Sequence, residues 1–201
     1  MAAADAPIIG FPSKAAFREW VEVHSADQDG LWLKLAKKGS GIPSPTYAEA
    51  LDVALCFGWI DGQKRPFDDK YWLQRFTPRR ARSKWSKINI AKVDALVASG
   101  EMTPSGLAEV ERAKADGRWD AAYEPQSTAT FPDDFLAALD QNAKAKATFA
   151  TITRSSKYAI IYRLGDAKRP ETRQRRLEQF IAQLADGHEI YPPIPGAGPK
   201  S

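Results

Sequence analysis

The residues that could do chemistry are arginines and aromatic side chains gathered in residues 56–92. A guanidinium group is a planar fork of donors that matches a phosphate or carboxylate, and aromatic faces stack on bases or cations. From residue 63 to residue 92, ten Lys and Arg residues stand against two Asp residues, so this segment carries +8 in a chain whose total is +4. The pattern predicts an anion-attracting surface with these candidate ligand-binding residues: Trp59, Asp61, Arg75, Arg79, Arg80, Ser83 and Trp85.

The chain offers little for covalent or metal chemistry. A nucleophilic Cys56 would need a neighbouring base, and the two histidines, His24 and His188, lie in no recognisable motif. Two His and one Cys with scattered acids do not make a metal-ligand pattern. We therefore predict no catalytic residues, no metal ligands and no cofactor.

The elements that must position the basic segment form a small α+β fold. Alternating apolar residues predict strands at 31–36, 59–61 and 70–77, and caps at Ser13 and Thr46 predict helices. Short links between these elements favour a small antiparallel or mixed sheet with helices on one face. After Pro78 the chain reads as helical, with Ser83 or Ser86 as the cap of the next helix and Thr103 before another.

The second half of the chain predicts an all-helical C-terminal module. Residues 118–132 are polar, with prolines near the end, and are the best candidate for a linker. Four short helical patterns follow. The predicted organisation is an N-terminal α+β domain at 13–123, a helical module at 132–187 and an extended or disordered tail at 188–201, with residues 1–12 as a loosely attached lead.

The composition of the chain and its N-terminal sequence predict the cellular compartment. A single cysteine fits a reducing compartment, and no apolar run approaches the ~18 residues of a membrane span. The N-terminus lacks the basic region of a signal peptide. These features predict a cytoplasmic protein of unknown oligomeric state.

Several separated motifs resemble one bacterial family. They are CFGWIDG (56–62), RFTPRRARSKWSKIN (75–89), GEMTPSGL (100–107), DGRWDAAY (116–123), PDDFLAALDQN (132–142) and AKRPETRQRRLEQFIAQLADG (167–187). Together they resemble the YdeI/OmpD-associated family, also labelled OmdA or bacteriocin-protection, from about Phe17 to Gly187. Glu101 departs from the basic residue expected there. The resemblance implies a role in tolerance to bacteriocins or antimicrobial peptides and supplies no catalytic residues.

Three functions stay open from the sequence. The first is a non-enzymatic stress or protection protein that binds an anionic ligand or acidic partner through the basic aromatic surface. The second is a nucleic-acid-binding protein that uses this surface and a second basic block at 154–176. The third is an enzyme acting on a small anionic substrate, with Asp61 as acid or base and Arg79 or Arg80 as clamp.

Overall fold

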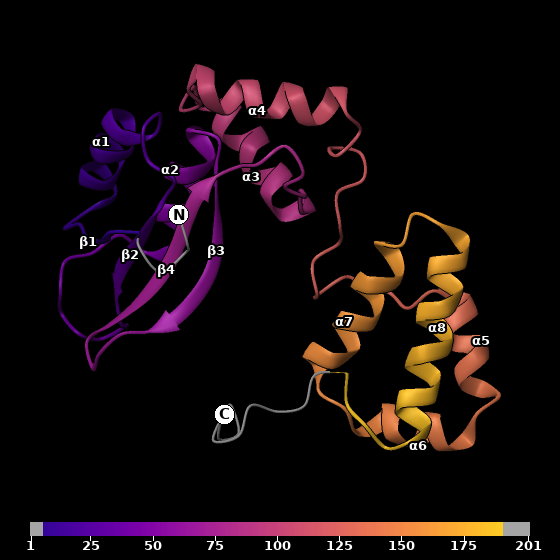
Figure 1. Ribbon diagram of the computed structural model, residues 1–201. Coiled ribbons are helices and arrows are strands. Elements are labelled where there is room, and N and C mark those ends of the chain that lie inside the picture. Colours follow the sequence, from indigo (N-terminus) through magenta and orange to yellow (C-terminus); the bar gives the residue numbers. More distant parts are fainter. Residues whose placement is uncertain (1–5, 191–201) are drawn as a thin grey trace. The chain divides into compact units, whose positions relative to one another are not determined.

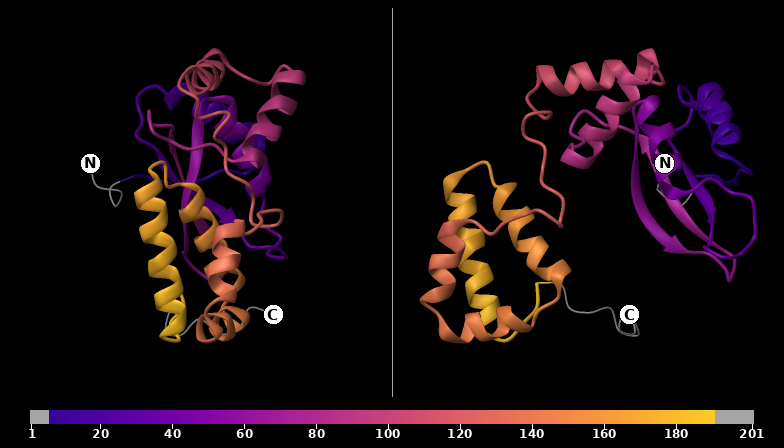
Figure 2. Two further views of the ribbon diagram at one scale, coloured as in Figure 1. Left: turned by 90° about the vertical axis from the view of Figure 1, so that its right-hand side faces the viewer. Right: turned by 180° about the vertical axis from the view of Figure 1, so that it is seen from behind.

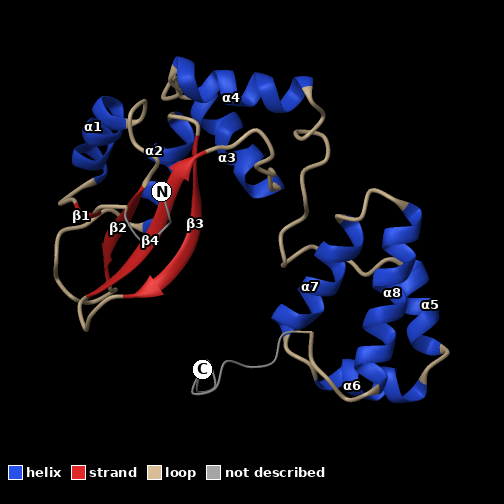
Figure 3. Ribbon diagram, viewed as in Figure 1, coloured by secondary structure: helices blue, strands red, loops and turns tan. Residues whose placement is uncertain are grey.

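The computed structural model describes residues 6–190 and divides the chain into two compact units, residues 1–122 and 123–201 (Figure 1). All strands found among residues 6–190 lie in the first unit, and the described part of the second unit is helical (Figure 3). The predicted tail lies outside the described residues from residue 191 onwards.

The first unit is built on a four-stranded mixed sheet. Its strands are β1 (Ile8–Gly10), β2 (Leu31–Ala36), β3 (Trp59–Pro66) and β4 (Tyr71–Pro78), in the order β1-β2-β4-β3. The β1–β2 pair is parallel and the other two pairs are antiparallel. The predicted mixed α+β fold is thereby confirmed.

Two strand predictions need correction. The prediction of a loose lead at residues 1–12 is wrong for residues 8–10, because these pair with β2 as a three-residue strand too short to show an alternating pattern. The predicted strand 59–61 is also too short. The strand continues to Pro66, with a register shift between Asp61 and Lys64 that accommodates Gly62.

Four helices complete the first unit: α1 (Lys14–His24), α2 (Tyr47–Cys56), α3 (Lys87–Ala98) and α4 (Pro104–Ala115). Local signals explain where they begin. Ser13, Ser86 and Thr103 each accept a backbone N–H through the side chain, and Thr46 forms a reciprocal capping box with Glu49. Of the two serines predicted as caps for α3, Ser86 takes the role.

The core of this unit lies between the helices and one face of the sheet. Leu31, Leu33 and Leu35 point to that face from β2 and share a cluster with Phe17 of α1 and with the apolar side of α2. Side chains alternate along a strand, so Trp32 points the other way. It is buried, as is Leu73 of β4, yet neither belongs to this core.

The start of α4 packs tightly against the end of α2. Both the backbone N–H and the hydroxyl of Thr103 donate to the Cys56 carbonyl oxygen, at 3.1 and 2.6 Å. A Cβ added at Gly106 would lie 2.7 Å from the Cys56 carbonyl carbon and closer still to its oxygen. Only glycine permits this approach.

The second unit contains the four predicted helices: α5 (Asp133–Asp140), α6 (Ala143–Thr151), α7 (Arg154–Gly165) and α8 (Pro170–Ala185). In Figure 2, α6 crosses one end of the other three helices. They enclose a separate apolar core that includes Phe135, Ile160 and Leu184. Residues just after α8 are attached to this unit, since the Glu189 carboxylate accepts from the Ser156 hydroxyl at 3.0 Å and Ile190 is buried.

No helix among residues 6–190 is both long enough and apolar enough to cross a lipid bilayer.

Candidate anion-binding site

The seven predicted ligand-binding residues do not gather on one surface. The Trp59 ring lies in the core, edge-on to Trp20 at 6.5 Å between centroids. Asp61 accepts a hydrogen bond from the Tyr47 hydroxyl at 2.8 Å. Trp59 therefore contributes to packing, and Asp61 is engaged by a residue of α2.

Arg79 and Trp85 are packed against each other inside the loop that leads into α3. Arg79 is 5% exposed and Trp85 is 2% exposed. The guanidinium carbon lies 3.4 Å from the ring centroid, within the range of a strong cation–π contact. Arg79 Nη1 also donates to the Lys84 carbonyl at 3.1 Å. The Arg79 guanidinium, which we predicted to bind a ligand, here contacts residues of the loop that contains it.

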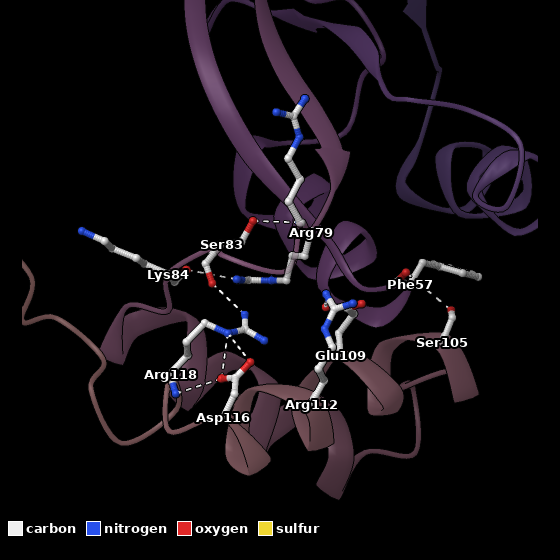
Figure 4. Close-up of polar contacts among 10 residues, drawn as sticks. Phe57, Arg79, Ser83, Lys84, Ser105, Glu109, Arg112, Asp116 and Arg118 are labelled. Atoms are coloured by element: carbon white, nitrogen blue, oxygen red, sulfur yellow. Dashed lines mark hydrogen bonds and ion pairs between the residues drawn. The ribbon is translucent and has the colours of Figure 1, made fainter.

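A second arginine secures the same loop from the turn after α4. Arg118 Nη1 donates to the Ser83 carbonyl at 2.8 Å, and its Nε bonds the Asp116 carboxylate at 2.8 Å (Figure 4). The Ser83 hydroxyl accepts from the Arg80 backbone N–H at 2.9 Å. Ser83 is thus a turn residue here. Of the predicted arginines at this junction, Arg80 is the exposed one.

Arg75 lies elsewhere, on the sheet face that points away from the helices. Its guanidinium carbon is 5.9 Å from the centroid of Trp32, and that of Arg65 is 4.1 Å from the same centroid. Lys34 lies on this side of β2, with Nζ 4.3 Å from the ring centre of Tyr71. We call Lys34, Arg65 and Arg75, with Trp32 and Leu73 beneath them, the cationic face.

Strand register brings these three cations together. Trp32 pairs with Arg75, and Lys34 pairs with Leu73, which also pairs with Arg65 on its other side. Paired residues point to the same side of a sheet. The remaining paired positions on this side are Ile8, Gly10, Ala36, Ile60, Tyr71 and Thr77. The described strands therefore place three cations and no carboxylate on this face.

The Arg75 guanidinium is partly buried, and its hydrogen bonding is incomplete. Burial lowers the pKa of Arg75, and the neighbouring Asp29 opposes that shift. Its Nη2 reaches the Asp29 carbonyl at only 3.4 Å, and its buried Nη1 has no acceptor among residues 6–190. A buried donor without an acceptor costs about 1–3 kcal/mol.

The stacking decides what the face presents to a ligand. Trp32 is 3% exposed because the two arginines cover it. The face therefore offers guanidinium groups rather than bare rings. Phe67, 45% exposed, is the nearby exception.

A cavity of 430 Å³ opens beside Lys34. It is lined by Gly10, Phe11, Pro12, Lys34, Pro43 and Tyr71. The link from β1 to α1 forms one wall, and strands β2 and β4 supply the lysine and the tyrosine. The walls combine apolar side chains with polar surface, and Lys34 supplies one positive charge.

The second unit has its own aromatic hollow of 260 Å³, lined by Tyr123, Ser155, Tyr158, Ala159 and Tyr162. The Tyr158 hydroxyl donates to the Glu124 carbonyl at 2.8 Å. Burial, followed by the neighbouring tyrosines, raises the pKa of Tyr158. Some of the second basic block serves the fold: Arg173 bonds Asp134, and Arg176 bonds the Arg163 carbonyl at 2.6 Å.

Sequence reasoning missed Lys34, Arg65 and Trp32 as site residues. The alternation of 31–36 already placed Trp32 and Lys34 on one face. The contribution of Arg65 depends on its pairing with β4 across a bulge, which no local pattern shows.

Comparison with known families divides the chain as the structure does. Residues 9–109 match a family described as Domain of unknown function (DUF8412). Residues 128–187 match the family described as Bacteriocin-protection, YdeI or OmpD-Associated. No curated protein and no solved structure gives a significant match. The resemblance seen in the sequence is thus confirmed through the helical module.

Proposed function

Because the chain belongs to the DUF8412 family and its second unit matches the model of the bacteriocin-protection, YdeI or OmpD-associated family, we propose that it is a non-catalytic protection protein that binds an anionic partner. The binding surface is the cationic face. The observation that carries this proposal is the pair of arginines stacked on buried Trp32 beside Lys34, with no carboxylate on the described strands of that face.

Stacking prepares these arginines for binding. A free arginine side chain loses rotamer freedom when it grips a ligand, and that loss weakens affinity. Arg65 and Arg75 already rest against Trp32, so part of the ordering cost is met during folding. Both guanidinium groups keep the planar geometry that suits carboxylates and phosphates.

The arrangement favours recognition of anionic groups over stacking of bases. Single-stranded nucleic acids bind on exposed aromatic platforms, and here the central ring is covered. The enzyme alternative has less support, since Asp61 accepts from the Tyr47 hydroxyl, Arg79 is buried on Trp85, and neither cavity described above is lined by Asp61 or Arg79.

The test compares two double variants with the same change in charge. Arg65→Gln with Arg75→Gln removes two cations from the cationic face, and Arg80→Gln with Arg82→Gln removes two exposed cations from the loop before α3. Binding of a fluorescein-labelled poly-glutamate peptide is measured by anisotropy at about 50 and about 200 mM salt, because salt screens charge-driven binding. A mixed-sequence oligonucleotide is titrated in parallel.

We expect the first pair to weaken peptide binding at least about tenfold and the second pair less than about threefold. Arg65→Gln alone changes an exposed position, so it still tests the site if the double variant fails to fold. Equal losses in the two pairs would mean that net charge alone drives binding and would overturn the assignment of the site. Tighter binding of the oligonucleotide than of the peptide would favour the nucleic-acid alternative.

A further inference from the structure

We propose that the partner is an acidic peptide segment in extended conformation that places one apolar side chain in the cavity beside Lys34. This inference rests on the proposed function and deepens it. Its basis is the position of a cavity with several apolar side chains next to the cluster of three cations, which occupy two successive rows on the same sheet face.

The cavity suits a single large apolar side chain. Phe11, Pro12, Pro43 and Tyr71 supply apolar walls, and Gly10 has no side chain to fill the space. The 430 Å³ volume lies within the range of ordinary ligand pockets. Lys34 lies at this cavity and also belongs to the cationic face, so a ligand that enters one reaches the other.

The spacing of the rows along β2 matches an extended peptide. Trp32 and Arg75 form the first row, Lys34, Leu73 and Arg65 the second, and Ala36 and Tyr71 the third. Successive rows are two residues apart, or about 6.6 Å along a strand. Side chains on one side of an extended peptide repeat at the same interval.

A peptide lying along the strands would therefore present an acid to Arg75, a second acid to Lys34 and Arg65, and an apolar residue to the cavity. The direction of β1 supports this order. Since β1 runs parallel to β2 with Gly10 opposite Lys34, Phe11 and Pro12 follow in the direction of the third row. The predicted pattern is acidic-x-acidic-x-apolar.

A peptide fits these features better than a polyphosphate chain. Phe11, Pro12 and Pro43 line the cavity beside Lys34, so a phosphate placed there would lie against apolar side chains. The three cations are clustered rather than continued along a groove. A peptide can carry both acidic side chains for the cationic face and an apolar side chain for the cavity.

The experiment is a double-mutant cycle that combines one variant of the protein with one change in the peptide. Gly10→Val fills the cavity without changing charge. A Cβ at Gly10 would lie 3.5 Å from the Lys34 Cβ, an ordinary contact, and its φ is not positive. Gly10→Ala serves as the smaller second variant. Short Gly/Ser peptides carrying Glu-Gly-Glu-Gly-Phe, Glu-Gly-Glu-Gly-Ala or Glu-Glu-Gly-Gly-Phe are titrated by calorimetry.

With the unaltered protein, the Phe peptide should bind about tenfold more tightly than the Ala peptide, because the ring leaves water. With Gly10→Val that preference should fall to about twofold or less, because the Phe peptide should lose more affinity than the Ala peptide. The adjacent-acid peptide should bind more weakly than the alternating one. A Phe preference that survives Gly10→Val, or equal binding of the alternating and adjacent acids, would overturn the inference.

Failure of this inference is distinguishable from failure of the proposed function. If the alternating Ala peptide loses affinity on Arg65→Gln with Arg75→Gln but no peptide responds to Gly10→Val, the cationic face binds anions and the cavity plays no part. If none of the peptides responds to the arginine changes, the proposed function itself is wrong.

Discussion

The guanidinium carbon of Arg79 lies 3.4 Å from the centre of the Trp85 ring, and both residues are buried. This contact closes the loop before α3. The loop in turn meets the turn after α4, through Arg118 and through Trp119, whose ring centroid is 4.9 Å from that of Trp85. Residues 79–85 and 118–119, which belong to two of the stretches that carry the family resemblance, are thus packed together.

The other two resembling stretches of this unit also meet each other. Thr103 and Gly106 of residues 100–107 pack on the Cys56 carbonyl of residues 56–62. These motifs are therefore explained by contacts that hold the fold. The candidate binding surface lies on the opposite face of the sheet.

Replacing Arg79 should cost stability rather than binding alone. Arg79→Gln removes the stacking on Trp85 and the bond to the Lys84 carbonyl, so we expect a loss of about 2–3 kcal/mol. All six tryptophans lie in the first unit, so Trp fluorescence during urea unfolding reports that unit. The control, exposed Arg80→Gln, should change stability by less than about 0.5 kcal/mol. Equal effects would show that the contact contributes little.

Gly106 should tolerate no side chain. Gly106→Ala drives a methyl group into the Cys56 carbonyl, where backbone must move, so we expect a loss of at least about 3 kcal/mol or failure to fold. Gly62→Ala is the matched control, because its Cβ would meet Arg75 at 3.6 Å, an ordinary distance. The two variants are compared by the urea midpoint of Trp fluorescence. Similar midpoints would show that α4 can shift away from α2 at little cost.

The Cys56 thiol should be unreactive in the folded protein. Burial is the main cause that raises the pKa of Cys56, and Arg18 opposes this shift. A buried thiol with a raised pKa forms little thiolate and is not accessible to a reagent. Reaction with a chromogenic disulfide at about pH 8 should therefore be slow in buffer and should rise with urea along the Trp fluorescence transition. Fast reaction before that transition would contradict the buried position.

The second unit should lose an ion-pair contribution at acid pH. Arg173 of α8 bonds the Asp134 carboxylate of α5 and lowers the pKa of Asp134. Because the folded pKa is depressed, this stability is present above the unfolded pKa of about 4 and disappears as pH falls through the folded value. Asp134→Asn should lower stability at pH 7 by less than about 1 kcal/mol, since the pair is partly exposed.

The measurement is thermal unfolding followed by far-UV circular dichroism at several pH values. The difference between the unaltered chain and Asp134→Asn should shrink as pH drops below about 4. Asp133→Asn, at the same helix start, is the control and should show a smaller difference at pH 7. A difference that stays constant from pH 7 to about pH 2 would rule out the charge as its source.

Local sequence determined the elements that depend on neighbours along the chain. Ser13, Thr46 and Thr103 each cap a helix through the residue three positions ahead, so their roles can be read from spacing. The alternation in 31–36 likewise predicted a strand with Trp32 and Lys34 on one side. The mixed α+β fold and the helical second half followed from such patterns.

Tertiary structure alone decided which cations face outward together. Arg75 and Arg79 lie four residues apart in the same basic stretch, yet one joins the cationic face and the other is buried on Trp85. The reason is that burial of an arginine depends on partners distant in sequence: Trp32 and Arg65 across strands for the first, and the loop held by Arg118 for the second. Charge density along the sequence predicted an anion-attracting protein, and strand register determined where those charges meet.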